Sequence, residues 1–538
     1  MASSPKSTIV MATKAQVARL TRPRSVLHPV YRDVALTGVA SVGTSVAGLL
    51  IVSMVARWMG PSSVAEYLLV RRIATWMSAF SLLGMGVALP RYVAHAVGKK
   101  DVQYVYFAAA LVVGVGLPLV FGVVMLLAHD TSSNLLFGKA GIHLVLPLAL
   151  LLLGYCSHAV VFGFFRGRLQ MKRTSAMQLI SYFVLPLVIV AVLWRTRSIA
   201  LIIAAIGAST TLISLLFALP VLPHVVRTLS RKLVQPTREL LRYGVSRIPG
   251  DIATGGLFTL PPIIAARFVP MSEVAYMLLG LGMLTVISQA VNPLNQVLLS
   301  KVSMMLALQR RDEARRYIEY LFAAALEVAT FAALQVIAFT DVIVRLWVGP
   351  RFTGHLLLIR LLVAAIPLYL VYLALRSVID AASVKAYNAR NITSTLVTFV
   401  VLALASLEFT PANGKLEGVS AALLASFLLL SYLTYRTAHQ LYDLEPKWLN
   451  SAPGVITGVV LGGIGILVRV AQGNYMPVTE FLAFELIASV AFLAVIYHLR
   501  TPWLMFIART LFQPRGVKGD AEAVPDAPEA PSEIQDSL

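Results

Sequence analysis

Long apolar segments constrain the fold of this chain more than any other feature. A helix that crosses the hydrocarbon core of a bilayer, roughly 30 Å thick, needs about 20 apolar residues. Fourteen segments of about that length are present, and they are continuously apolar, which predicts helices and not the alternating strands of a barrel. The sequence therefore predicts an all-α polytopic membrane protein with about fourteen transmembrane helices. The segments lie near residues 34–56, 67–90, 104–128, 141–164, 176–194, 199–222, 248–267, 274–300, 317–340, 355–379, 392–409, 417–439, 453–471 and 479–499.

The distribution of basic residues predicts how these helices are oriented. The chain of 538 residues has 45 Lys and Arg against 25 Asp and Glu, a net charge of +20. Most of the basic residues lie in the termini and in the loops after even-numbered segments, which is the bias of cytoplasmic loops. We therefore expect a multi-pass protein of the inner (plasma) membrane with both termini cytoplasmic. Its basic surface should contact anionic membrane lipids, and no nucleic acid is expected as a partner.

An internal repeat with a spacing of about 210 residues predicts two similar lobes. The matches fall on helices of the same orientation, so a pseudo-two-fold axis along the membrane normal should relate the copies. We expect two six-helix lobes followed by a C-terminal helix pair. The matched pairs are Arg57 and Arg267, Tyr67 and Tyr276, Arg91 and Lys301, Asp101 and Asp312, Phe107 and Phe322, Gly138 and Gly349, and Arg166 and Arg376.

The repeat and the composition of the loops divide the chain into six parts. The connection between the lobes is long and basic, and the C-terminal residues are polar and acidic, which is typical of a disordered tail. The expected parts are a cytoplasmic basic arm at 1–33, an N-terminal lobe at 34–223, a cytoplasmic linker at 224–247, a C-terminal lobe at 248–440, a helix pair at 441–500 and a cytoplasmic acidic tail at 501–538.

Short motifs at helix ends resemble those of a transporter family. Gly60-Pro61 and Ala65-Glu66-Tyr67 precede or begin the second apolar segment, and Leu83-Gly84-Met85-Gly86-Val87-Ala88-Leu89-Pro90-Arg91 ends it. Val348-Gly349-Pro350-Arg351-Phe352 precedes the tenth segment. With the helix number and the repeat, residues 30–500 resemble the oligosaccharide (Wzx-type) flippases, which are polysaccharide biosynthesis transporters. These belong to the multidrug/oligosaccharidyl-lipid/polysaccharide (MOP) superfamily, together with the lipid II flippases and the MATE drug exporters.

The resemblance implies an architecture and an activity. Members of the family have two six-helix lobes around a central cavity and work by alternating access. The implied activity is to flip a polyprenyl-pyrophosphate-linked oligosaccharide from the inner to the outer leaflet for cell-surface polysaccharide biosynthesis. The implied partners are this lipid-linked oligosaccharide, membrane lipids, a polysaccharide polymerase and the chain-length machinery.

Five arginines in or near the apolar segments are candidate substrate-binding residues. A charge in the hydrocarbon core costs about 2.5–3.5 kcal/mol, so each one needs a compensating role. A guanidinium group can bind two oxygens of a pyrophosphate, which is anionic at neutral pH. The alternative is that an arginine near a helix end reaches the membrane interface and has no further role. The candidates are Arg57, Arg71, Arg72, Arg267 and Arg360.

Arg71 and Arg72 depart from the pattern of the family, in which small or apolar residues are expected at this place. Adjacent residues are about 100° apart on a helix, so we expect one of the two to face the cavity. The second copy of the repeat has Leu279-Gly280-Leu281 at the equivalent place. The strongest functional candidates thus lie where the symmetry of the repeat fails.

Three other polar residues inside the apolar segments are candidates. Glu327 lies about ten residues inside the ninth segment and is the candidate for coupling to protons or sodium. The alternative that we favour is that it pairs with an arginine on another helix and only fixes the packing of the helices. Asn292 and Gln296 flank Pro293 and would either line a path for the sugars or form hydrogen bonds between helices.

The remaining features favour a transporter over an enzyme. The sequence has no His, Cys and carboxylate grouping with metal-site spacing and no Walker A loop, so neither a metal nor another cofactor is expected. The expected outer loops are short, which leaves little room for a polymerase or ligase site. The alternative function is a MATE-like exporter of drugs or organic cations. The first apolar segment has no carboxylate after Asp33, which argues against that alternative.

Overall fold

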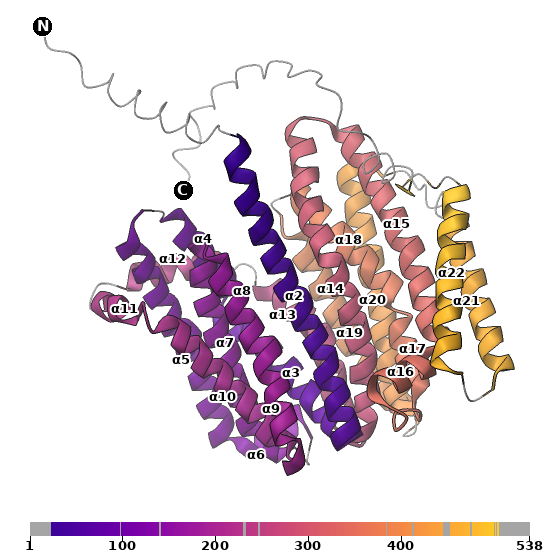
Figure 1. Ribbon diagram of the computed structural model, residues 1–538, viewed down its shortest axis with the longest axis horizontal. Helices are drawn as coiled ribbons and strands as arrows, with labels where there is room; N and C mark the ends of the chain where they lie inside the picture. The colour runs from indigo at the N-terminus through magenta and orange to yellow at the C-terminus, as the bar shows by residue number, and fades with distance from the viewer. Residues whose placement is uncertain are drawn as a thin grey trace, which may run out of the picture.

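The computed structural model describes residues 23–504 with short gaps, and every regular element within them is a helix (Figure 1). The expected arm at 1–33 and tail at 501–538 therefore lie mostly outside the described residues. The gaps are residues 97, 139–140, 230–232, 246–247, 384, 412–413, 445–451, 474–475, 500 and 502, and the side chains of 23–35, 288–301 and 307 are also outside the description.

The first half of the chain forms one helical bundle, called here the N-terminal bundle. Its interior is filled by aromatic and aliphatic side chains, for example Phe107 and Phe164, whose ring centroids are 4.2 Å apart. Its helices are α2 (Pro23–Met59), α3 (Pro61–Leu82), α4 (Met85–His95), α5 (Lys100–Leu127), α6 (His129–Leu136), η1 (Ile142–Leu144), α7 (Val145–Gly167), α8 (Met171–Leu179), η2 (Ile180–Val184), α9 (Leu185–Leu193), η3 (Trp194–Thr196) and α10 (Ile199–Ala218).

Helix α2 begins earlier than the sequence predicts. The apolar segment starts at residue 34, but the helix starts at Pro23 and includes the last part of the expected basic arm. Proline is favoured at the first position of a helix because its missing N–H leaves no helical hydrogen bond unmade. Hydropathy marks the part of a helix that can lie in lipid, and a helix can extend beyond it into water.

Helices α3 and α4 are bent by 49° at a short break. Leu83 and Gly84 in the break have left-handed φ angles of 46° and 77°. The break is packed against α12 (Val234–Val245), since a Cβ atom on Gly84 would lie 2.4 Å from the Cα of Gly244. The expected linker at 224–247 thus contains two helices, α11 (Leu222–Leu229) and α12, and α12 is docked on the N-terminal bundle.

The second half forms the C-terminal bundle and an additional helix pair. The bundle has an aromatic interior that includes Phe258, Tyr369 and Phe427. Its helices are α13 (Ile248–Ala265), α14 (Met271–Ala307), α15 (Arg311–Ala338), α16 (Thr340–Val348), α17 (Leu356–Val363), α18 (Ile366–Ala382), α19 (Tyr387–Phe409) and α20 (Lys415–Tyr442), and the pair is α21 (Ala452–Ala471) and α22 (Val478–His498).

The fourteen apolar segments all coincide with helices, but fewer meet the requirements for a membrane span. Within the described residues, eleven helical segments are long and apolar enough, or twelve if the bent pair of α3 and α4 is one span. The two other predicted segments fall on α13 and α14. Gly, Thr and two prolines dilute the apolar residues of α13, and the apolar described part of α14 is the shorter stretch Met271–Ile287.

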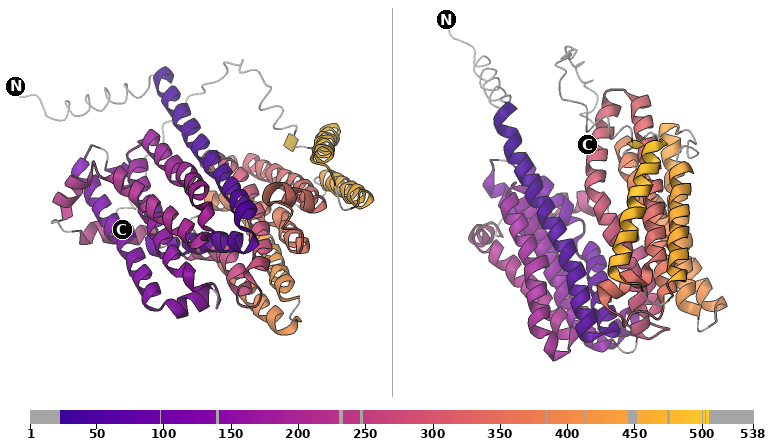
Figure 2. Two further views of the ribbon diagram at one scale, coloured as in Figure 1. Left: turned by 60° about the horizontal axis from the view of Figure 1, so that its bottom comes forward. Right: turned by 45° about the vertical axis from the view of Figure 1, so that its right-hand side comes forward.

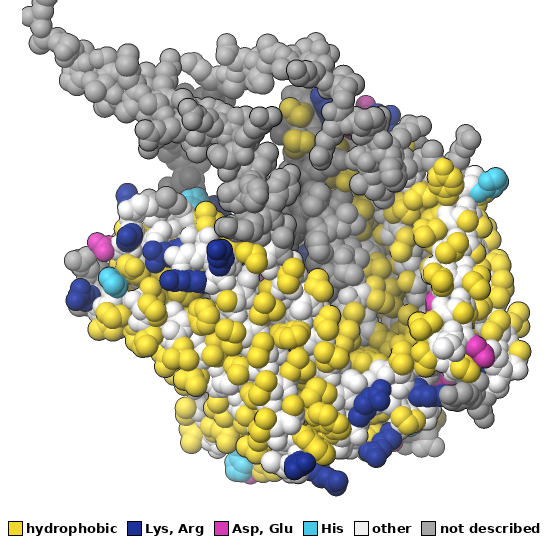
Figure 3. Space-filling model, viewed as in Figure 1, with side chains coloured by type: hydrophobic (Ala, Val, Ile, Leu, Met, Phe, Trp, Pro, Cys, Tyr) yellow, Lys and Arg dark blue, Asp and Glu magenta, His cyan; other side chains and the backbone are white. Residues whose placement is uncertain are grey.

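The two bundles lie side by side and are adjacent at the ends where α2 and α15 finish. In Figure 1 these ends are at the bottom, and the ribbons of α2 and α14 diverge toward the top, as they also do in the right-hand view of Figure 2. Figure 3 shows hydrophobic side chains in a broad band across the molecule, with Lys and Arg gathered above and below it. This arrangement is that of a multi-pass membrane protein.

Helix α21 packs on α15 through glycines that share one face. These are Gly454, Gly458, Gly462 and Gly465, and all four are buried. A Cβ atom on Gly462 would lie 2.6 Å from the Cβ of Leu334, whereas one on the neighbouring Gly463 would meet nothing within 4 Å. Small residues of this kind let two helices approach closely where both are surrounded by lipid. The glycine face therefore fixes the helix pair to the C-terminal bundle.

Gly462→Leu is expected to lower the thermal stability of the purified protein and to loosen the helix pair. The added side chain cannot fit against Leu334 unless α21 moves away from α15. Gly463→Leu is the matched control, because it adds the same side chain to the open face of the same helix. The unfolding temperature measures the effect. Equal stability of the two variants would contradict this packing.

Candidate functional site

Arg71 and Arg72 of α3 point in different directions. The Nη1 of Arg71 lies 3.5 Å from the hydroxyl oxygen of Tyr67, one helical turn away, and its guanidinium carbon lies 5.4 Å from the centre of that ring. Tyr155 of α7 also interacts with this guanidinium group. Arg71 is thus held within the N-terminal bundle by tyrosines.

Arg72 reaches from the N-terminal bundle to the C-terminal bundle. Its Nη1 donates a hydrogen bond of 3.5 Å to the backbone carbonyl of Phe258 in α13. Its Nε is buried and has no hydrogen-bond partner among the described residues. A second contact one turn away joins the same helices, where the indole N–H of Trp76 donates to the carbonyl of Ile252 at 3.0 Å. Arg72 therefore places a partly satisfied positive charge between the two bundles.

A row of aromatic rings continues from Arg72 into the C-terminal bundle. The ring of Phe258 lies 5.2 Å from that of Tyr369, which is stacked on Tyr372 at 5.8 Å. Both tyrosines are on α18, three residues apart, and Arg376 follows on the same face of that helix. The two tyrosines interact with the Arg376 guanidinium group. Arg72 of the N-terminal bundle and Arg376 of the C-terminal bundle thus lie at the two ends of this row, whose rings all belong to the C-terminal bundle.

Among the described residues, carboxylates interact with Arg376 but not with Arg72. Asp380 and Asp251 interact with Arg376. Asn388 holds this end of the row by donating to Asp380 at 2.7 Å and to the backbone carbonyl of Arg376 at 2.9 Å. The sequence identifies Arg376 only as the repeat partner of Arg166, and not as a candidate binding residue. The signal that identifies it is the spacing of 369, 372, 376 and 380, which puts these side chains on one helical face.

This row, from Arg72 to Arg376, has residue types that bind phosphorylated sugars, but Tyr369 and Tyr372 are buried here, so a sugar can reach their rings only in another conformation. Guanidinium groups bind phosphate oxygens through paired hydrogen bonds. Aromatic rings offer flat apolar surfaces against which the C–H faces of a sugar ring can pack. Within the described residues no group of His, Cys, Asp and Glu has the geometry of a metal site.

Arg57 and Arg267 join the two bundles at the end of the molecule where α2 and α15 finish. The Nη2 of Arg57, at the end of α2, donates to the backbone carbonyl of Leu346 in α16 at 2.7 Å. The Nη2 of Arg267, just after α13, donates to the backbone carbonyl of Leu135 in α6 at 2.9 Å. The arginines are repeat partners, and the two leucines are also about 210 residues apart. Each bundle therefore holds the other through an equivalent arginine, and we call these two contacts the clasps.

The glycine pair of the repeat lies beside the clasps. Gly138 and Gly349 both have left-handed φ angles, of 75° and 98°. A Cβ atom on Gly138 would lie 2.6 Å from the carbonyl oxygen of Ala266, next to Arg267. The positive φ and the close approach explain why this position is glycine. Two of the seven matched pairs of the repeat thus lie where the two bundles meet.

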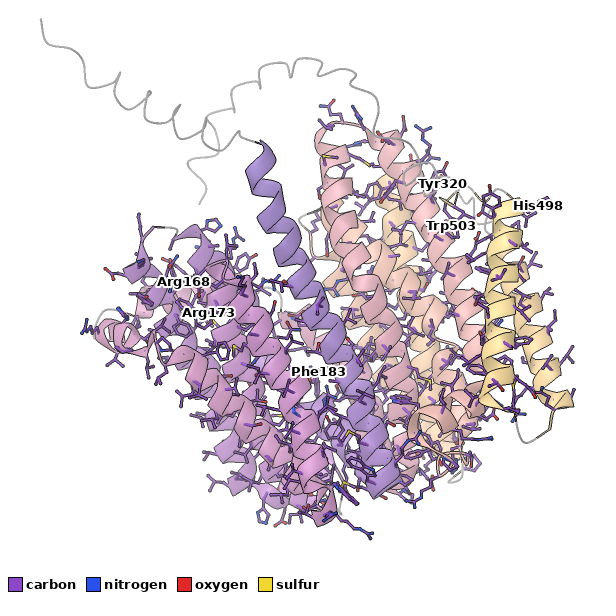
Figure 4. All side chains as sticks on the ribbon, viewed as in Figure 1. Arg168, Arg173, Phe183, Tyr320, His498 and Trp503 are labelled. Atoms are coloured by element: carbon purple, nitrogen blue, oxygen red, sulfur yellow. The ribbon has the colours of Figure 1, made fainter. Side chains whose placement is uncertain are left out.

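The other candidate residues lie apart from this row. Arg360 of α17 lines a hollow beside α16 and α21. Glu327 of α15 is fully buried against α21 and accepts a hydrogen bond of 2.7 Å from the indole of Trp503, which lies close to Tyr320 in Figure 4. Among the described residues the hydrogen-bond partner of Glu327 is therefore a tryptophan and not the arginine that the packing alternative expected. Helix α14 continues through Asn292 and Gln296, but their side chains lie outside the described residues.

Comparisons with known proteins agree with the fold and the sequence motifs. A profile for the family described as polysaccharide biosynthesis protein matches residues 30–304, just over half of the chain. No curated protein sequence matches. The chain is similar in structure to lipid II flippase MurJ in an inward closed conformation, with a TM-score of 0.63, 13% identity, and coverage of 89% of this chain and 100% of the other.

Two MATE transporters are also similar in structure. For an inward-facing multidrug resistance MATE family transporter of the MOP superfamily, the TM-score is 0.62, with 16% identity and coverage of 74% of this chain and 94% of the other. For the eukaryotic MATE transporter AtDTX14, the TM-score is 0.51, with 15% identity and coverage of 77% and 99%. The chain therefore has the fold of these MOP-superfamily transporters. The profile match covers more than half of the chain, so the chain belongs to the polysaccharide biosynthesis protein family, which confirms the resemblance found in the sequence.

Proposed function

We propose that this transporter flips a polyprenyl-pyrophosphate-linked oligosaccharide from the inner to the outer leaflet for cell-surface polysaccharide biosynthesis. The observation that carries the proposal is the row from Arg72, on the N-terminal bundle, through the aromatic rings of the C-terminal bundle to Arg376. A lipid-linked oligosaccharide combines a pyrophosphate with sugars, and the row combines guanidinium groups with aromatic rings. Membership of the polysaccharide biosynthesis family supports the same substrate class.

In the proposed mechanism, the headgroup enters between the bundles while the prenyl tail stays in lipid. Arg72 neutralises part of the pyrophosphate charge, which lowers the cost of removing it from water. Arg376 is already balanced by Asp380 and Asp251, so it would orient the headgroup more than attract it. The bundles then rock against each other, the clasps of Arg57 and Arg267 break, and the headgroup leaves on the other side.

The proposal includes a topology. In it, α13 and α14 also cross the membrane, which gives fourteen spans in two six-helix lobes related by a pseudo-two-fold axis, and a C-terminal pair. The paired clasps and glycines about 210 residues apart support this symmetry. The basic loops favour cytoplasmic termini, so the clasped ends, at which α2 and α15 finish, would face the outside. The described conformation would then be closed outward.

Cells without this protein are expected to lose surface polysaccharide and to accumulate the lipid-linked oligosaccharide. The precursor should remain at the cytoplasmic leaflet because no other step moves its charged headgroup across the bilayer. Immunodetection of surface polysaccharide and mass spectrometry of extracted lipids measure the two effects. Normal polysaccharide together with sensitivity to organic cations would contradict the proposal and favour the MATE-like exporter.

A further inference from the structure

A second basic site lies at the clasped end, away from the aromatic row. It is a hollow of about 550 Å³ between the C-terminal bundle and the helix pair. α15 and α21 end beside it, so in a membrane it lies at the level where lipid headgroups meet water. Figure 3 shows Lys and Arg side chains gathered at the lower edge, below α16 and α17 of Figure 1. The hollow is lined by Asp341, Arg345, Thr353, Leu356, Arg360, Arg469, Val470 and Gly473.

The charges that line the hollow are unequal. Among the described residues of the lining, Asp341 is the one carboxylate, and it faces three arginines. The Nε of Arg469 lies 3.0 Å from each carboxylate oxygen, and its Nη2 is also bonded to Oδ2, so this arginine is paired. Arg345 lies 3.8 Å from the same carboxylate. Burial opposes ionisation of Asp341, but the hydrogen bonds and charge of Arg469 outweigh it and lower the pKa of this carboxyl group.

Arg360 is the basic residue that Asp341 does not pair with. It enters the hollow from α17, and its Nε is buried without a hydrogen-bond partner among the described residues. A buried, unsatisfied N–H on a charged group is costly, and an anion in the hollow would remove that cost. With Asp341 ionised, the three arginines leave the lining with two positive charges in excess.

We propose that this hollow binds a phosphate group, with Arg360 as its principal ligand and Arg345 as the second. The size suits a single phosphate headgroup, and Leu356 and Val470 supply apolar walls beside which a lipid chain can begin. A phosphate offers several acceptor oxygens, so it can serve both guanidinium groups at once. The same chemistry is present in a phospholipid headgroup and in free phosphate. The site does not depend on the proposed function, because it shares no residue with the row between Arg72 and Arg376.

Native mass spectrometry and thermal unfolding of the purified full-length protein test this inference. The probes are phosphatidylglycerol, diacylglycerol as a lipid without phosphate, and inorganic phosphate. We expect phosphatidylglycerol, inorganic phosphate or both to bind and to raise the unfolding temperature, and diacylglycerol to do neither. Binding of inorganic phosphate alone would identify free phosphate as the source, and binding of phosphatidylglycerol alone would identify a lipid headgroup.

Arg360→Gln is expected to weaken the binding at least about tenfold, which is the lower end of what one hydrogen bond to a charged group contributes. Arg351→Gln is the matched control, because Arg351 is exposed in the loop just before α17 and does not line the hollow. If Arg360→Gln does not fold, Arg345→Gln serves in its place, since it keeps the pair of Asp341 and Arg469. Equal binding by the wild-type protein and a folded variant, or no binding of any phosphate probe, would overturn the proposal.

Discussion

Arg72→Ala is expected to reduce transport of the lipid-linked oligosaccharide roughly 10- to 100-fold. One hydrogen bond between charged groups contributes about 1.5–3 kcal/mol, and each 1.4 kcal/mol is a factor of ten. Arg72 lies between the bundles, and its Nε has no hydrogen-bond partner among the described residues. Its loss would leave the pyrophosphate without a counter-charge while it leaves water. Surface polysaccharide in cells that carry only the variant measures the effect.

Two other arginine variants serve as controls for this result. Arg72→Lys keeps the charge but loses the paired geometry, so it should restore part of the transport. Arg351→Ala removes an exposed arginine from a loop and should leave surface polysaccharide unchanged. Membrane insertion and unfolding temperature establish that each variant is folded. Full polysaccharide with Arg72→Ala would contradict a role for this residue in substrate binding.

Cross-linking of the two clasps is expected to stop transport completely. In the proposed mechanism the contacts of Arg57 with Leu346 and of Arg267 with Leu135 must break in every cycle. Cysteines at either pair, joined by a short bis-methanethiosulfonate linker, would hold the bundles together at this end. The chain has one cysteine, Cys156, which is buried, so a Cys156→Ala background leaves only the introduced thiols.

The linker is cleaved by reductant, which allows one protein sample to serve as its own control. Transport should be absent after cross-linking and should return after reduction. Single-cysteine variants treated with the same reagent should keep their activity, since they cannot join the bundles. Leu346 and Leu135 are exposed, so the reagent can reach both positions. Unchanged transport by fully cross-linked protein would show that the bundles do not separate here.

The helices and Arg72, at one end of the row, can be predicted from the sequence, because both are recognised from the residues of one segment alone. Arg72 is identified as a charge inside an apolar helix, where any charge is costly. Arg376 is missed because a basic residue toward the end of a helix is common and gives no such signal. Its importance comes from Tyr369, Tyr372 and the contact with Phe258, and that contact depends on how α13 and α18 pack.

The repeat predicts the positions of the clasps but not what they touch. Arg57 and Arg267 match in sequence, and they were candidates for substrate binding. In the structure each donates to a backbone carbonyl of the opposite bundle. A backbone acceptor leaves no trace in the residue type, so Leu346 and Leu135 could not be found from the sequence. Likewise, the partner of Glu327 is Trp503, after the C-terminal pair, and Arg360 lines a hollow together with residues of α21, far away in the chain.

Transport by the purified protein in lipid vesicles tests directly whether it flips the lipid-linked oligosaccharide. Lipid-linked oligosaccharide extracted from cells that lack the protein is placed in the vesicle membrane, and a glycosidase added outside reports the fraction that it can reach. We expect wild-type protein to make nearly all of the oligosaccharide accessible, and Arg72→Ala to slow this roughly 10- to 100-fold. An accessible fraction that stays at the level of protein-free vesicles, with wild-type protein folded and inserted, would contradict it.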